Sequence, residues 1–344
     1  MSLRFRRSMK LMPGVRLNFN KNSVGLSLGV KGAHYTVNSK GRRTVSAGIP
    51  GTGLYSVETL SSGRSARSTR QSATLPQSVS SGPPAPGLFA GKDERELNKF
   101  LLDIYNAESK DTPQEVVDKA ATLKSNHPNL APPANLITFL HGVTEDVVNV
   151  DLDALGKDLW DNRASYFNDS LVRKYLKGIT PSAQITRGIS TNEIYNVQTL
   201  GFIYAELLQS KGKLDEALAV LEEMNPDQLV AIAIADIELM DKKYDQAIET
   251  TEDIENEDDA TGMLLVLRGI AFREKLLEDA AIECFKRALS HKDRSEGLKH
   301  RALFERAETY SRMGKKAMAV KDLEKIMVDE PNYPEVEEKL AALS

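Results

Sequence analysis

Four segments in the second half of the chain resemble one another and decide the fold. They read GKLDEALAVLEEM (212–224), KKYDQAIETTEDI (242–254), LLEDAAIECFKRAL (276–289) and GKKAMAVKDLEKIM (314–327). They align on Ala217, Ala247, Ala281 and Ala319, with spacings of 30, 34 and 38 residues. Small residues that recur in this way allow paired helices to approach closely and to stack in a row. The sequence therefore predicts an all-α solenoid.

The repeated segments resemble the tetratricopeptide repeat (TPR) family, whose period is about 34 residues. The small and aromatic residues that carry the resemblance are Gly269, Phe272, Ala281, Phe285 and Ala288, followed by Ala307, Tyr310, Gly314, Ala319 and Pro331. The resemblance implies a TPR-like solenoid over residues 194–344. We expect the amphipathic stretch 334–343 to form its C-terminal capping helix. It also implies a scaffold that binds proteins in a concave groove.

We expect this groove to bind a peptide or a whole protein partner. In the register of the family, one row of groove residues is Phe202, Ile232, Val266 and Phe304. The second row is Glu206, Asp236, Ile270 and Glu308, with Arg273 one turn further along. Apolar side chains beside acidic ones suit an extended or helical peptide with basic side chains. The alternative interpretation is that Phe202 and Phe304 belong to the core between repeats.

Residues 1–57 alternate between apolar and polar side chains, as in Val15-Arg16-Leu17-Asn18-Phe19. This period of two predicts a small antiparallel β domain with one apolar face. The stretches 5–33 (FRRSMKLMPGVRLNFNKNSVGLSLGVKGA) and 48–56 (GIPGTGLYS) resemble domain-of-unknown-function family 4236. The resemblance implies a bacterial origin and a glycine-rich β module. It implies no activity.

Residues 58–92 are rich in Ser, Gly, Pro and Arg, which predicts a flexible linker. Residues 93–193 predict a helical region that either continues the array as degenerate repeats or caps it. Within it, we expect the prolines of HPNLAPPANL (127–136) to break the helical pattern. The fold class is thus α+β and multidomain, with a β domain, a disordered linker and a TPR-like solenoid.

The charge is distributed unevenly. Residues 1–70 carry 13 Lys or Arg and one acid, a net charge of +12, whereas the remainder carries 32 bases and 48 acids, a net charge of −16. The predicted basic surface consists of Arg4, Arg6, Arg7, Lys10, Arg16, Arg42 and Arg43. Such a surface suits nucleic acid, anionic lipid or acidic protein. An intramolecular alternative is that the basic half folds back onto Glu206, Asp236 and Glu308.

The sequence predicts no catalytic residue, cofactor or metal site, and therefore a protein that is not an enzyme. The glycines of residues 48–53 lack the Lys-Ser/Thr pair of a phosphate loop. The five histidines lack metal-ligand spacing, and we expect all of them on the surface. Cys284, the only cysteine, is expected to be a packed thiol. Without a membrane-length apolar run or a secretory signal, the predicted location is cytoplasmic.

Overall fold

The computed structural model describes residues 83–105, 111–145, 147–191 and 193–343 with their side chains, and nearer the N-terminus the backbone of six strands. These strands are β1 (Ser8–Met12), β2 (Val15–Asn20), β3 (Ser23–Val30), β4 (Ala33–Asn38), β5 (Arg43–Gly48) and β6 (Tyr55–Leu60). They pair antiparallel in sequence order. That they form a domain with one apolar face stays a prediction. Of residues 58–92, the predicted linker, the stretch 61–82 lies outside the described residues.

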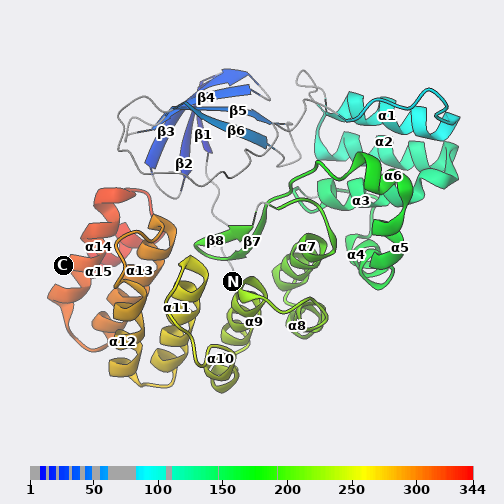
Figure 1. Ribbon diagram of the computed structural model, residues 1–344. Coiled ribbons are helices and arrows are strands. Elements are labelled where there is room, and N and C mark those ends of the chain that lie inside the picture. Colours follow the sequence, from blue (N-terminus) through cyan, green and yellow to red (C-terminus); the bar gives the residue numbers. More distant parts are fainter. Residues whose placement is uncertain are drawn as a thin grey trace, which may run out of the picture.

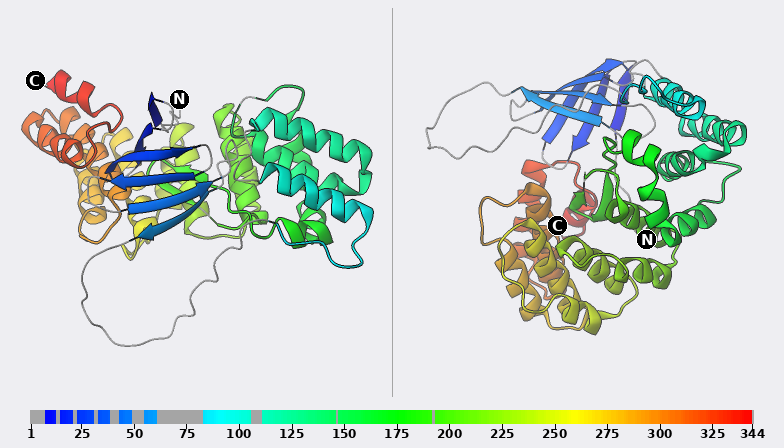
Figure 2. Two further views of the ribbon diagram at one scale, coloured as in Figure 1. Left: turned by 90° about the horizontal axis from the view of Figure 1, so that it is seen from above. Right: turned by 45° about the vertical axis from the view of Figure 1, so that its right-hand side comes forward.

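The remaining described chain is mostly helical and follows the sequence from α1 at one end to the C-terminus at the other (Figure 2). Its first part contains α1 (Lys92–Ile104), α2 (Pro113–Asn126), α3 (Ala131–Gly142), α4 (Leu152–Asp161), α5 (Arg163–Asn168) and α6 (Ser170–Tyr175). A short hairpin follows, with β7 (Ala183–Thr186) and β8 (Ile189–Thr191). The second part contains α7 (Val197–Ser210), α8 (Leu214–Glu222), α9 (Gln228–Met240), α10 (Tyr244–Thr250), α11 (Asp259–Glu274), α12 (Glu278–Ala288), α13 (Glu296–Arg312), α14 (Lys316–Asp329) and α15 (Val336–Leu343).

The proline-rich stretch 127–136 breaks the helical pattern at its start, since α2 ends at Asn126, and then begins a new helix. A 3₁₀ turn over Pro128–Leu130 leads directly into α3. Pro132 and Pro133 stand in the first turn of α3, where a backbone N–H has no intrahelical acceptor and the fixed φ of proline suits the helix. α3 packs against α2 and supplies buried residues such as Leu136 and Phe139 to the core.

Helices α7 to α14 form four antiparallel pairs that stand side by side in a curved row (Figure 1). The pairs are α7/α8, α9/α10, α11/α12 and α13/α14. The aligned alanines of the second helices, Ala217, Ala247, Ala281 and Ala319, are all completely buried. Each alanine therefore lies against neighbouring helices, as the repeat register predicts, and the TPR-like solenoid is confirmed.

Within each pair, the turn between the two helices contains one residue with a left-handed backbone. These residues are Gly212 (φ 75°), Lys242 (φ 61°), Leu276 (φ 61°) and Gly314 (φ 72°). The following residue donates its backbone N–H to a carbonyl five positions earlier, as Leu277 does to Phe272 at 2.9 Å. This is the Schellman arrangement that ends helices. The turn is thus the same in all four pairs, although only two of them use glycine.

The first helix of each pair begins with a side-chain cap. Asn196, Asp227, Asp258 and Ser295 each accept a hydrogen bond from a backbone N–H in the first turn. Such caps satisfy donors that have no partner inside the helix. The last pair is covered by α15, whose Val336 is buried against the C-terminal part of the core together with Leu340 and Leu343. That α15 serves as the cap of the array stays a prediction.

Candidate functional site

The inner face of the curved row holds the β7–β8 hairpin (Figure 1). β7 packs against α7 and α9, the first helices of the first two pairs. The gap that remains where Gln184 and Ile185 meet Phe202 and Glu206 has a volume of only about 10 Å³. That is no more than the space of one water molecule. The hairpin therefore fills this part of the groove.

Thr186, the last residue of β7, is fixed to helix α9. Its hydroxyl donates a hydrogen bond to Oδ1 of Asp236 at 2.9 Å, while Gln209 of α7 approaches the other carboxylate oxygen at 3.5 Å. Burial raises the pKa of the Asp236 carboxyl, and Arg301 and the two hydrogen bonds oppose this shift. The side chain of Asp236 thus serves as the acceptor that aligns the hairpin.

Arg187, at the tip of the hairpin, reaches the far end of the array. Its guanidinium carbon lies 4.7 Å from the ring centre of Phe304 and 4.6 Å from that of Tyr333. It also approaches the carbonyl oxygen of Pro334 at 3.3 Å and Oε1 of Glu335 at 3.4 Å. These four residues, Phe304, Tyr333, Pro334 and Glu335, are called the arginine cradle below. They combine aromatic faces with two acceptors, the chemistry that a guanidinium prefers.

Gly188 completes the tip in a conformation that favours glycine. Its φ is +108°, and a Cβ built on it would lie 2.9 Å from Cε of Met263 and 3.2 Å from the carbonyl oxygen of Gly297. A larger residue would therefore be strained and would also collide with α11 and α13. The tip Thr186-Arg187-Gly188 is thus held by α9, α11, α13 and the segment before α15.

A buried group of charges lies beside this tip. Nη1 of Arg273 is 2.7 Å from Oε2 of Glu305, and Nε of Arg301 is 3.0 Å from Oε1 of the same carboxylate. Burial alone would raise the pKa of Glu305, but the two arginines outweigh burial and lower it. Glu274 extends the network by pairing with Arg273 and with Arg312. This network joins α11 to α13.

The predicted groove residues occupy different environments. Ile232 and Val266 are completely buried, and Phe202, Ile270, Arg273 and Phe304 are also buried. Glu206, Asp236 and Glu308 are half-buried. Asp236 and Phe304 contact the hairpin through Thr186 and Arg187, whereas Glu308 pairs with Lys339 of α15 at 2.9 Å. That a partner contacts these nine residues stays a prediction.

Sequence reasoning missed the hairpin and its Arg187. A signal was available in AQITRGIST (183–191), where two short runs with β-branched residues flank an Arg-Gly turn. The surrounding helical patterns hid it because each run has only three or four residues. Tyr333 was also missed, since it lies between α14 and α15 and outside the repeat register.

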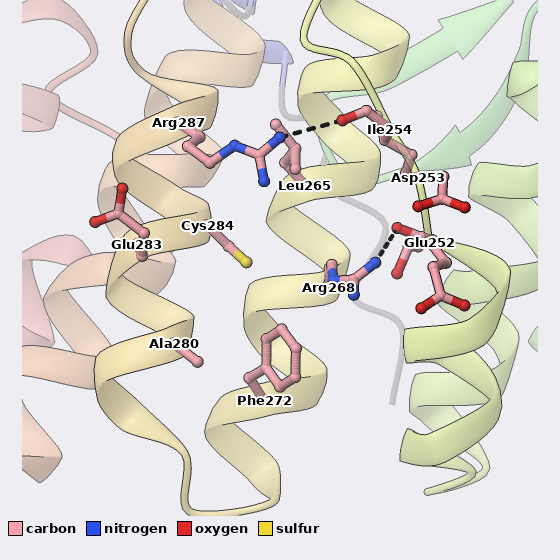
Figure 3. A pocket seen from close by; sticks show the side chains of 11 residues that line it. Glu252, Asp253, Ile254, Leu265, Arg268, Phe272, Ala280, Glu283, Cys284 and Arg287 are labelled. Atoms are coloured by element: carbon pink, nitrogen blue, oxygen red, sulfur yellow. Dashed lines mark hydrogen bonds between the residues drawn. The ribbon is translucent and has the colours of Figure 1, made fainter.

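A second hollow lies between the α10–α11 loop and helices α11 and α12 (Figure 3). Its volume is about 470 Å³. Arg268 and Arg287 point into it, but they donate to the backbone oxygens of Thr251 and Ile254 at 2.6 and 3.1 Å. Cys284 also lines it and is buried, as predicted, and burial raises the pKa of its thiol. The two arginines thus hold the loop onto the array.

Two histidines depart from the prediction that all five lie on the surface. His141 of α3 is completely buried, and neither ring nitrogen has a hydrogen-bond partner. His300 of α13 is almost completely buried, beside Asp329 and Glu330. Both lie on helix faces that pack into the core. The residues around them in the sequence did not indicate this burial. Burial lowers the pKa of His141 to about 4.

Among the described residues, no group of three or more His, Cys, Asp or Glu side chains is placed to hold a metal ion. In the same part of the chain, no helix combines the length and the apolar character that crossing a bilayer requires. The predicted basic residues Arg4, Arg6, Arg7 and Arg42 lie outside the described residues, and Lys10, Arg16 and Arg43 are described only as backbone.

The helical part of the chain therefore has a TPR-like fold, and the likeness to the first of the following two solved structures agrees with it. The N-terminal domain of the EccA1 ATPase from the ESX-1 secretion system of Mycobacterium tuberculosis is 16% identical, with a TM-score of 0.53 over 68% of this chain and 84% of that one. The Cut9–Hcn1 hetero-tetramer of the APC/C is 14% identical, with a TM-score of 0.39 over 73% of this chain and 43% of that one.

At the other end of the chain, residues 3–57 match the family described as protein of unknown function (DUF4236). This match confirms the resemblance seen in the glycine-rich N-terminal stretch. No curated protein matches the chain.

Proposed function

We propose that the protein is a non-catalytic scaffold that binds a protein partner through its TPR-like array. The observation that carries this proposal is the curved row of four helix pairs. Their first helices include aromatic and charged residues such as Arg273 and Phe304. Stacked helix pairs present extended concave surfaces of the kind that proteins bind. The proposed contact residues are Phe202, Glu206, Ile232, Asp236, Val266, Ile270, Arg273, Phe304 and Glu308. The buried members contribute by shaping the groove.

Affinity capture with the intact protein tests this function. We expect a partner in a fixed stoichiometry that survives nuclease treatment and washes at high salt. The variant Glu206→Lys/Glu308→Lys reverses two charges on the first helices and should release the partner. The matched control Glu216→Lys/Glu283→Lys reverses two exposed charges on the second helices and should retain it. Failure to capture any stoichiometric partner contradicts the proposal.

A second candidate function is contact with nucleic acid or an anionic membrane through the N-terminal segment, while the array recruits a partner. The net charge of +12 over residues 1–70 favours it. Phosphate contacts release counterions, so such binding should weaken steeply with added salt. Gel-shift and vesicle assays with the intact protein distinguish the two surfaces. The control replaces by glutamine the seven basic residues Arg4, Arg6, Arg7, Lys10, Arg16, Arg42 and Arg43. Equal binding by both proteins, or none, rejects this function.

The same charge imbalance supports an intramolecular contact, in which the basic half folds onto Glu206, Asp236 and Glu308. A flexible coil of about 35 residues, the length of the predicted linker, would span on the order of 30 Å, which is enough reach. If this contact forms, replacing the seven basic residues should increase the affinity of the array for its partner. Unchanged affinity would exclude it.

A further inference from the structure

We propose that the arginine cradle is a recognition site for an arginine at a tight turn of the partner protein, and that the chain's own β7–β8 hairpin occupies this site until the partner displaces it. The inference rests on the proposed function and identifies the chemistry of the partner. It starts from the way the array holds the tip Thr186-Arg187-Gly188, which resembles the way a receptor holds a bound peptide.

The chemistry of the cradle selects arginine. The rings of Phe304 and Tyr333 lie 5.7 Å apart at 44°, and the planar guanidinium of Arg187 contacts both faces. A lysine ammonium lacks this planar surface and the paired donors that reach Pro334 and Glu335. Glu305 adds negative charge nearby, since Arg187 contributes to lowering its pKa. Lys339 faces the Phe304 ring at 5.4 Å but is paired with Glu308.

The neighbouring contacts define the residues on either side of the arginine. Asp236 accepts a hydrogen bond from the Thr186 hydroxyl, so a residue with a hydroxyl group fits before the arginine. The closeness of Met263 and Gly297 leaves room only for glycine after it. We therefore expect the partner segment to carry Thr-Arg-Gly, or Ser-Arg-Gly, at a tight turn.

Arg187 itself remains reachable from solvent, although Ala183, Ile185 and Thr186 of β7 are buried. The two polar contacts of Arg187 are long, at 3.3 and 3.4 Å, and its side chain keeps 28% of its surface exposed. Glu335, at the edge of the cradle, is 42% exposed. β8 has only three residues, of which Ser190 is exposed. A competing segment thus has access to the cradle from solvent.

The test uses a backbone-cyclised, fluorescently labelled peptide of sequence AQITRGIST, which reproduces residues 183–191. Its binding to the intact protein is measured by fluorescence anisotropy. The variant Arg187→Ala/Gly188→Val removes the anchor and strains the tip, so the cradle becomes free for the peptide. Since occupancy lowers apparent affinity in proportion to the free fraction, this variant should bind the peptide about 10-fold or more tightly than the wild type. The control Arg173→Ala, an exposed arginine of α6, should bind as the wild type does.

Peptide variants test the chemistry of recognition. With the arginine of the peptide changed to lysine, we expect an affinity loss of about 5-fold or more, and with alanine a loss of binding. Glu335→Gln in the cradle of the double variant should also weaken binding. Circular dichroism and thermal melting establish that each variant is folded. If the double variant is unfolded, the single variant Arg187→Ala replaces it in the same comparison.

Three results would overturn the inference. They are equal binding by the wild type and the double variant, equal binding of the arginine and alanine peptides, and no binding to any folded variant. A partner that the intact protein captures, but that the peptide does not displace, leaves the scaffold function standing and rejects only the role of the cradle.

Discussion

Gly269 of α11 lies directly against the ring of Phe285 of α12, so closely that a Cβ on residue 269 would come within 2.5 Å of the ring carbon Cε1. Both residues are buried, and they join the two helices of the third pair. Both residues carry the resemblance to the repeat family, and the structure shows that they pack against each other. The absence of a side chain at residue 269 therefore sets the distance between the helices.

The first prediction follows from this contact. Gly269→Ala should destabilise the protein by about 1–3 kcal/mol, because the buried ring has no room to move and overpacking outweighs the better helix propensity of alanine. Urea unfolding followed by circular dichroism measures the change. Gly178→Ala is the control, since nothing lies within 4 Å of its Cβ position. The second substitution Phe285→Leu should restore part of the lost stability in Gly269→Ala. Equal stabilities for both glycine variants would contradict the packing argument.

The second prediction concerns the left-handed turns. Leu276→Gly and Lys242→Gly should each stabilise the protein by about 1 kcal/mol, because glycine adopts positive φ without steric cost. Leu277→Gly, one residue later at φ −104°, has no strain to relieve and should destabilise it. Thermal melting separates the outcomes. A lower melting temperature for Leu276→Gly would show that the leucine side chain stabilises the protein by more than its left-handed backbone destabilises it.

The third prediction concerns His141. Burial lowers its pKa in the folded state to about 4, whereas the unfolded chain keeps the ordinary value of 6.5. Between these pH values the unfolded state binds a proton at His141 and the folded state does not, so the free energy of unfolding falls as pH decreases from about 6.5 to 4. The loss from this residue is about 3 kcal/mol at most. His141→Leu should remove this part of the pH dependence, while the exposed control His291→Leu should keep it. Identical profiles of urea midpoint against pH for His141→Leu and the wild type would contradict it.

The fourth prediction concerns the buried charges. Glu305→Gln leaves Arg273 and Arg301 without a buried carboxylate and should destabilise the protein by about 3–5 kcal/mol. Glu308→Gln, which removes the more exposed pair with Lys339, should cost less than about 1 kcal/mol.

Because the folded-state pKa of Glu305 is lowered, its contribution to stability is present above the carboxyl's ordinary pKa and is lost as pH falls through the lowered value. Urea unfolding at neutral and acidic pH measures both effects. Similar losses for the two variants would mean that the buried network contributes little.

The sequence was sufficient for the repeated part of the fold. The aligned alanines recur because the helices pack in the same way in each repeat, so periodicity reveals them. Arg187 and Tyr333 could not be found in this way, since they come from irregular segments and meet only after folding, 146 positions apart in the chain. The burial of His141 escaped for a related reason: a single polar residue on an apolar helix face gives no periodic signal.

In a solenoid, each repeat ordinarily touches only its neighbours, and unfolding spreads from one unit to the next. The hairpin changes this in the present chain, because Arg187 precedes the first helix pair and yet contacts Glu335 beyond the last one. Unfolding of either end of the array should therefore destabilise the other end. Deleting residues 181–192 should replace one cooperative unfolding transition by several. Without the hairpin, truncation of either end should reduce the stability of the rest of the array less than it does in the wild type.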